Sequence, residues 1–135
     1  MYNIGYDIGS SSIKAALVEV DTGKQIAVTH EPEGEMGMIS PKVSWAEQDP
    51  EVWWELICLA TKKLLKQTGI DSAKISGIGI AYQMHGLVVV DRNGSPLRNA
   101  IIWCDSRAVA IGNEAFKALG TKKSVSYTHL TLPTN

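Results

Sequence analysis

A short polar turn separates two apolar strand patterns near the start of the chain. Residues 2–8 alternate and are apolar enough for a buried strand, and residues 13–20 show a second strand pattern. Only Gly9 and three consecutive serines separate them, so the two strands must be antiparallel neighbours. Asp7 lies at the end of the first strand. A carboxylate beside clustered hydroxyl and N–H groups is typical of a cradle for metal-bound polyphosphate, and also of an ordinary hairpin with a polar tip.

Further patterns extend this hairpin into a larger unit. Residues 24–29 form a third strand pattern after a short turn, which predicts three antiparallel strands. The stretch 31–43 is polar and contains glycines and prolines, so we expect a surface loop there. A long helix should follow, because Asp49 suits the N-cap, Pro50 the first helical position and Gly69 the C-terminal cap.

The apolar residues of this helix recur at the spacing of one buried face: Trp53, Leu56, Ile57, Ala60 and Leu64. Trp54 cannot share that face, and we expect it to cover a neighbouring loop. Residues 75–82 then show a buried-strand pattern with two glycines, which favour close approach by another group. Because a helix intervenes, this strand should lie parallel to an earlier one through a right-handed crossover.

Two shorter patterns complete the order of elements. Residues 87–91 and 97–103 flank an Asn-Gly pair, which predicts a hairpin, and Ser106 can cap a last helix that ends at Gly120. Three antiparallel strands, a helix, a parallel strand, a hairpin and a helix together predict an α/β layered architecture. Residues 121–135 are Thr-rich without a helical stripe, and we expect a non-native or disordered tail that resembles translated adaptor sequence.

Composition and charge argue against several classes of function. The chain has 13 Lys and Arg against 14 Asp and Glu, a net charge of −1, so nucleic acid is not an expected partner. No apolar run approaches the roughly 20 residues of a membrane span, and no charged leader precedes an apolar stretch, so we expect neither membrane insertion nor secretion. Cys58 and Cys104 lie in different predicted elements, which favours two free thiols in a reducing cytoplasm.

Four segments, in this order, carry a resemblance to the FGGY carbohydrate kinases of the actin, Hsp70 and sugar-kinase superfamily. The segments are Asp7-Ile8-Gly9-Ser10-Ser11-Ser12, Trp45-Ala46-Glu47-Gln48-Asp49-Pro50 followed by Trp53-Trp54, Gln83-Met84-His85-Gly86, and Trp103-Cys104-Asp105-Ser106-Arg107. The first is weakly specific, whereas the second and third together are much more specific and look most like the xylulokinase branch. The resemblance covers residues 1–120 as the N-terminal part of the first kinase domain. It implies a truncated ribonuclease H-like (actin-like ATPase) fold with a mixed sheet.

The resemblance implies ATP and Mg²⁺ as cofactors. Asp7 matches the aspartate that holds the magnesium of MgATP. Gly9, Ser10 and Ser11 match the turn around the transferring phosphate, and Lys14 lies where a basic residue often follows. Phosphoryl transfer needs positioning and charge neutralisation more than covalent chemistry, and such a turn can supply both. For Lys14, a solvent-exposed strand end is the alternative interpretation.

The resemblance also implies a sugar-binding side. Met84 and His85 match the substrate motif, in which an imidazole can hydrogen-bond sugar hydroxyls and a thioether can form an apolar wall. Trp103 would form a second wall, since aromatic faces suit sugar C–H surfaces; a core tryptophan is the alternative. Residues expected to support these groups are Gln83, Asp105 and Arg107. A metal site from His85, Cys104 and Asp105 is not expected, because their spacing is irregular.

The function expected from the resemblance is ATP-dependent phosphorylation of a sugar hydroxyl, with D-xylulose to xylulose 5-phosphate as the leading reaction. Gluconate, ribulose and glycerol are the alternative substrates. A homodimer is a possible state of the full-length enzyme. The family's catalytic base and adenosine-binding loops lie later than these residues, so no catalytic residue is assigned and the chain alone should be inactive. The alternative class is a non-catalytic actin-like or Hsp70-like nucleotide-binding module, which would keep the glycine-serine turn but has no need of residues 83–86.

Overall fold

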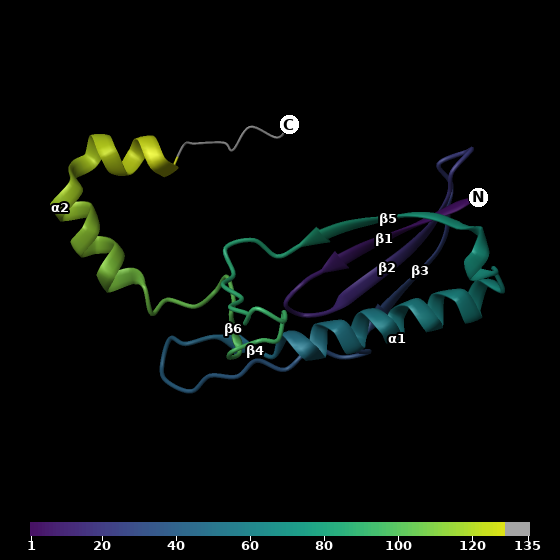
Figure 1. The fold of residues 1–135 in the computed structure, drawn as a ribbon, viewed down its shortest axis with the longest axis horizontal. Coiled ribbons are helices and arrows are strands. Elements are labelled where there is room, and N and C mark those ends of the chain that lie inside the picture. Colours follow the sequence, from purple (N-terminus) through teal and green to yellow (C-terminus); the bar gives the residue numbers. More distant parts are fainter. Residues whose placement is uncertain (129–135) are drawn as a thin grey trace.

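The computed structural model describes residues 1–128, with side chains through residue 120. Its main sheet has four strands in the order β3-β2-β1-β5, and the long helix α1 covers one face of the sheet (Figure 1). The strands are β1 (Tyr2–Ile8), β2 (Ile13–Glu19), β3 (Gln25–Glu31) and β5 (Ile75–Tyr82). The first three are antiparallel and β5 is parallel to β1, as the sequence predicts.

The helix α1 (Pro50–Thr68) begins and ends at the predicted caps. The Asp49 side chain accepts a hydrogen bond from the Glu51 N–H at 3.0 Å, which satisfies one of the free donors of the first turn. Gly69 has a φ of 66°, and its N–H bonds to the Leu65 carbonyl at 2.9 Å. A left-handed residue at this position favours glycine, so the helix is terminated by local chemistry.

The core lies between α1 and the inner face of the sheet. Leu56, Ala60 and Leu64 are the buried positions of the helix, and Trp53 and Ile57 pack beside them half-buried, as predicted. The strand residues that meet this face alternate along β1 and β2: Ile4, Tyr6, Ile13, Ala15 and Leu17. Hydrogen bonds also fasten the helix to the sheet. Thr29 Oγ1 donates to the Ala60 carbonyl at 3.0 Å, the Tyr6 and Thr61 hydroxyls bond at 2.6 Å, and Lys63 Nζ donates to Glu31 Oε1 at 2.9 Å.

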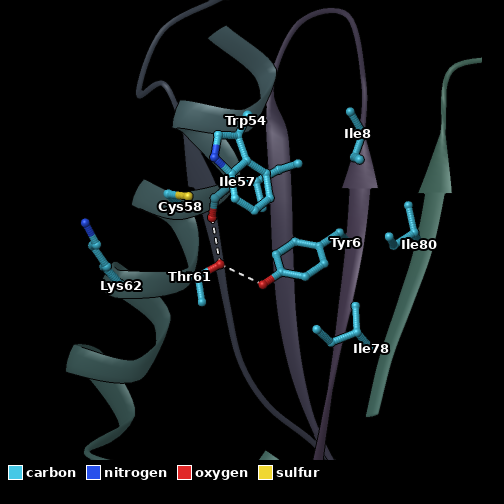
Figure 2. Close-up of a pocket in the computed structure, with 9 residues that line it drawn as sticks. All are labelled: Tyr6, Ile8, Trp54, Ile57, Cys58, Thr61, Lys62, Ile78 and Ile80. Carbon is cyan, nitrogen blue, oxygen red and sulfur yellow. Dashed lines mark hydrogen bonds between the residues drawn. The ribbon is translucent and has the colours of Figure 1, made fainter. Parts of the chain in front are cut away.

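The prediction that β5 is buried is wrong: Ile78 and Ile80 are 65% and 61% exposed. After the short 3₁₀ turn Ser72–Lys74, β5 forms the edge of the sheet beyond the part that α1 covers. An apolar groove of about 380 Å³ remains between α1 and the strands β1 and β5 (Figure 2). Trp54 lines this groove, so the expectation that it covers a neighbouring loop is wrong. At Gly77 a Cβ would lie 2.9 Å from Asn3 Oδ1, so the predicted close approach is confirmed there.

The hairpin predicted around the Asn-Gly pair is confirmed at its turn but not in the length of its strands. The Asp91 N–H bonds to the Ser95 carbonyl and the Leu97 N–H to the Val89 carbonyl, both at 2.9 Å. Residues 87–99 form isolated bridges and no strand, and β6 (Ala100–Ile101) pairs with β4 (Glu47–Gln48) in a separate two-stranded sheet. Ser106 does not cap a helix: its hydroxyl donates to the Ser44 carbonyl at 3.2 Å.

The last helix, α2 (Val109–Thr128), lies apart from the main sheet (Figure 1). Its expected apolar positions are exposed, including Phe116 at 46%. Gly120, the predicted helix end, has non-helical dihedrals (φ 74°, ψ 160°) inside this element. Residues 129–135 of the predicted tail lie outside the described residues, so the interpretation of 121–135 stays a prediction.

Leu64→Ala should destabilise the chain by about 2–5 kcal/mol, because it leaves a cavity where a fully buried side chain packs against the sheet. Urea unfolding followed by circular dichroism measures this loss. Leu59→Ala is the matched control on the same helix, since Leu59 is 51% exposed, and should change the free energy of unfolding by about 0.5 kcal/mol or less. Equal losses for the two variants would contradict the described packing.

Candidate active site

The carboxyl ends of β1 and β5 lie side by side because the two strands are parallel neighbours. Ile8 is opposite Tyr82, and the Gln83 N–H donates to the Ile8 carbonyl at 3.0 Å. The turn after β1 and the segment Gln83–Gly86 therefore leave the sheet at the same edge. This edge is where ligands bind in open α/β sheets.

The turn after β1 is held tightly by backbone contacts. The Gly9 N–H bonds to the Ser12 carbonyl at 3.2 Å, and a Cβ on Gly9 would lie 3.1 Å from that same oxygen. A larger residue would therefore have to open the turn. The Ser11 carbonyl accepts from the Met36 N–H at 2.7 Å, which fixes the turn to the following loop. Small residues and fixed backbone give a ligand close access to the turn.

Asp7 and Lys14 face each other across the β1–β2 pair at 3.4 Å. Both side chains are more than half exposed, so their ion pair contributes little to stability. A carboxylate oxygen is the kind of ligand that magnesium prefers, and Asp7 presents one beside the serine turn. The residues present therefore fit a magnesium ion that is bound mainly through phosphate oxygens.

The segment after β5 combines exposed and buried polar groups. Met84 and His85 are exposed, and His85 has a φ of 61°, a left-handed conformation that is unusual for a residue other than glycine. Such outliers cluster at functional sites. The Gln83 amide is buried, and neither its nitrogen nor its oxygen has a hydrogen-bond partner in the described part of the chain. Buried amides are normally satisfied, so an additional polar group is expected beside Gln83.

Trp103 is brought directly to the serine turn. Its indole N–H donates to the Ser10 hydroxyl at 3.0 Å, although the two residues are 93 positions apart. The indole is 59% exposed, so it is not the core tryptophan of the alternative interpretation. Trp103, which the resemblance assigns to the sugar side, is therefore in contact with Ser10, which it assigns to the phosphate turn.

Asp105 and Arg107 form an ion pair, and this pair fastens the loop that carries Trp103. Arg107 Nη2 lies 2.7 Å from Asp105 Oδ2 and 2.7 Å from Glu47 Oε1, and the Ala46 N–H donates to Asp105 Oδ2 at 2.7 Å. The same guanidinium stacks 3.7 Å above the Trp45 ring. Within the described residues, Asp105 and Arg107 bond to the 45–47 segment and not to Met84 or His85.

The charges of this cluster hold one another in their ionised forms. The hydrogen bond from Arg107 holds the pKa of Asp105 well below its usual range and also lowers the pKa of Glu47, although desolvation opposes both shifts. In return, Asp105 raises the pKa of Arg107. Asp105 therefore keeps its charge, and its ion pair with Arg107, at pH values below the ordinary range of carboxyl titration.

Sequence reasoning missed the role of Gln48. Its side chain is buried, and Nε2 donates to the Ser10 carbonyl at 2.7 Å and to the Gly37 carbonyl at 3.2 Å, while Oε1 accepts from Trp53 Nε1 at 3.2 Å. Sequence reasoning also missed the role of Glu47, whose buried carboxylate pairs with Arg107. Both residues belong to a motif that carried the resemblance, and two polar residues just before a helix N-cap were the available signal.

Within residues 1–128, no group of three or more His, Cys, Asp or Glu side chains is arranged to hold a metal ion. Cys104 instead lies 4.0 Å from the Met38 sulfur. No helix of the described chain has the length and apolar character needed to span a membrane.

Comparison with known proteins gives a consistent set of matches. Residues 2–134 match the model of the FGGY family of carbohydrate kinases, N-terminal domain. The xylulose kinase of Bacillus subtilis is 38% identical over 106 residues, which are 78% of this chain and 20% of that protein. The glycerol kinase of Sinorhizobium fredii is 33% identical over 126 residues, which are 93% of this chain and 24% of that protein.

Among solved structures, xylulose kinase from Rhodospirillum rubrum matches with a TM-score of 0.77 and 29% identity, over 92% of this chain and 24% of that one. This match confirms the predicted fold class. The chain spans about a fifth to a quarter of the length of these relatives.

Proposed function

Because the chain belongs to the FGGY family of carbohydrate kinases, we propose that it forms the phosphate-binding turn and one wall of the sugar site of an ATP-dependent sugar kinase. The observation that carries this proposal is the meeting of the serine turn with residues 83–86 and Trp103 at one edge of the sheet. A nucleotide-binding module without a second substrate would need the turn alone.

The proposed reaction transfers the γ-phosphoryl group of ATP to a sugar hydroxyl. The hydroxyl oxygen forms a bond to the γ-phosphorus, the bond from that phosphorus to the bridging oxygen breaks, and ADP leaves with the electron pair. The hydroxyl proton passes to a base, an aspartate that the family resemblance places later than these residues. Transfer of this kind depends mainly on alignment and charge neutralisation.

Residues of this chain would supply the alignment. Asp7 would hold magnesium, which when bound neutralises charge on the phosphates. The backbone N–H groups and hydroxyls of Ser10 and Ser11 would donate to phosphate oxygens, with Lys14 adding positive charge nearby. The sugar would lie against exposed Met84 and Trp103 and would hydrogen-bond to His85.

We propose D-xylulose as the substrate and xylulose 5-phosphate as the product, supported by the names of the xylulose kinases among the relatives. Glycerol, gluconate and ribulose remain the substrates to test beside it, since a glycerol kinase matches nearly as well.

We also propose a cytoplasmic location, supported by the two unpaired cysteines, Cys58 and Cys104.

Asp7→Ala should lower turnover by about a hundredfold or more, because it removes the magnesium ligand while leaving the core unchanged. The measurement is sugar-dependent ADP release by a complete kinase, in which residues 1–108 of this chain replace the matching segment of the Bacillus subtilis enzyme. Asp21→Ala, at an exposed turn, is the matched control and should keep full turnover. The 135-residue chain by itself should release no ADP above background. Near-normal turnover of the Asp7 variant would show that Asp7 is not the magnesium ligand.

His85→Ala in the same kinase should raise the KM for the sugar by about two- to tenfold with little change in the KM for ATP. The expected loss is one hydrogen bond to a sugar hydroxyl, roughly 0.5–1.5 kcal/mol. His30→Ala, an exposed histidine on β3, should leave both constants unchanged. A parallel loss for ATP, or loss of folding by circular dichroism, would make His85 a structural residue.

A further inference from the structure

The hydrogen bond between Trp103 and Ser10 joins the two halves of the proposed site. An indole nitrogen can only donate, so the Ser10 oxygen must accept in this 3.0 Å contact. The serine hydroxyl has one proton, and that proton is then left to be donated elsewhere. Its direction is restricted, because one lone pair of the oxygen is already engaged by the indole.

The backbone of Ser10 is fixed independently of this contact. Its carbonyl accepts from Gln48 Nε2 at 2.7 Å, and Gln48 is itself 3% exposed and held by Trp53. The buried amide therefore sets where Ser10 lies. Among the described residues, Trp103 is the partner that the Ser10 hydroxyl engages, so the indole determines how that hydroxyl is turned.

Trp103 is supported from the same short segment of chain. The Ile102 N–H bonds to the Ala46 carbonyl at 3.0 Å, and the Ala46 N–H bonds to Asp105 at 2.7 Å. Residues 46–48 thus hold the backbone on both sides of the Trp103–Ser10 contact. The indole face nevertheless remains open, since the side chain is 59% exposed, and a sugar resting on it would restrict its motion.

We propose that Trp103 is a positioning residue that orients the Ser10 hydroxyl toward the transferring phosphate, and that sugar bound against the indole stabilises this orientation. The proposal rests on the proposed function, because it assigns the indole to the sugar wall and Ser10 to the phosphate turn. The new element is a direct coupling between the sugar wall and the phosphate turn. Occupancy of the sugar side then improves alignment on the phosphate side through a single hydrogen bond.

The functional test is a double-mutant cycle in the complete kinase described above. Trp103→Phe keeps an aromatic face and removes the N–H, so kcat should fall about two- to tenfold while the KM for the sugar changes less than about threefold. Ser10→Ala should lower kcat by about tenfold or more. In the Trp103→Phe, Ser10→Ala double variant, kcat should equal that of Ser10→Ala within about twofold, because the indole then has no hydroxyl to orient.

Trp54→Phe is the matched control, since Trp54 is exposed and lines the groove beside α1, and it should leave kcat unchanged. Ser10→Thr keeps the hydroxyl and should remain sensitive to Trp103→Phe. Multiplied losses in the double variant, or an effect of Trp103→Phe on the sugar KM alone, would overturn the coupling. A parent kinase without sugar-dependent turnover would instead contradict the proposed function.

A structural readout does not depend on activity. In the ¹⁵N-labelled 135-residue chain, the indole N–H signal of Trp103, assigned by its loss in Trp103→Phe, should shift on Ser10→Ala and stay near its place on Ser10→Thr. The indole signal of Trp54 should not move in either variant. A Trp103 signal that is insensitive to Ser10→Ala would show that the hydrogen bond does not form in solution, and would overturn the proposal.

Discussion

The parallel pairing of β5 with β1 is the constraint on which the candidate site depends. Backbone pairing along seven register positions brings Tyr82 beside Ile8, so that the chain segments after both strands begin at one edge of the sheet. A parallel pair needs a crossover, and α1 supplies it while burying Ala60 and Leu64 against β1 and β2. Packing of the helix thus fixes the relative position of two loops that are more than seventy residues apart in sequence.

A second layer of support comes from residues 45–48, just before α1. Gln48 holds the Ser10 carbonyl, and Glu47 with Ala46 holds the loop of Trp103 through Arg107 and Asp105. Glu47 and Gln48 are almost fully buried, which is unusual for such polar side chains unless they are paired. Their side chains bond to Ser10, Gly37 and Arg107, and also to Arg98 and to Trp53 of α1. The segment therefore ties the loops of the site to one another and to the start of α1.

Features set by local chemistry could be predicted from the sequence. The caps of α1 at Asp49 and Gly69, its buried stripe and the tight turn at Gly9 follow from neighbouring residues alone. The exposure of β5 could not be read from its apolar pattern, because a buried strand and an apolar edge strand share that pattern. Long-range polar contacts, such as Trp103 with Ser10, were equally hidden, since spacing along the chain does not encode them. Family resemblance located the site residues, and the fold was needed to join them.

Paramagnetic broadening can show whether the serine turn and the segment after β5 form one site. Mn²⁺ in place of Mg²⁺ would be added with ATP to the ¹⁵N-labelled 135-residue chain. We expect the amide signals of Gly9 to Ser12 and of Gln83 and the indole signal of Trp103 to broaden together, and Asp7→Asn to abolish the effect. Broadening confined to other carboxylates, such as Glu33 or Asp91, or broadening unchanged in Asp7→Asn, would show that the serine turn and the segment after β5 do not form this site.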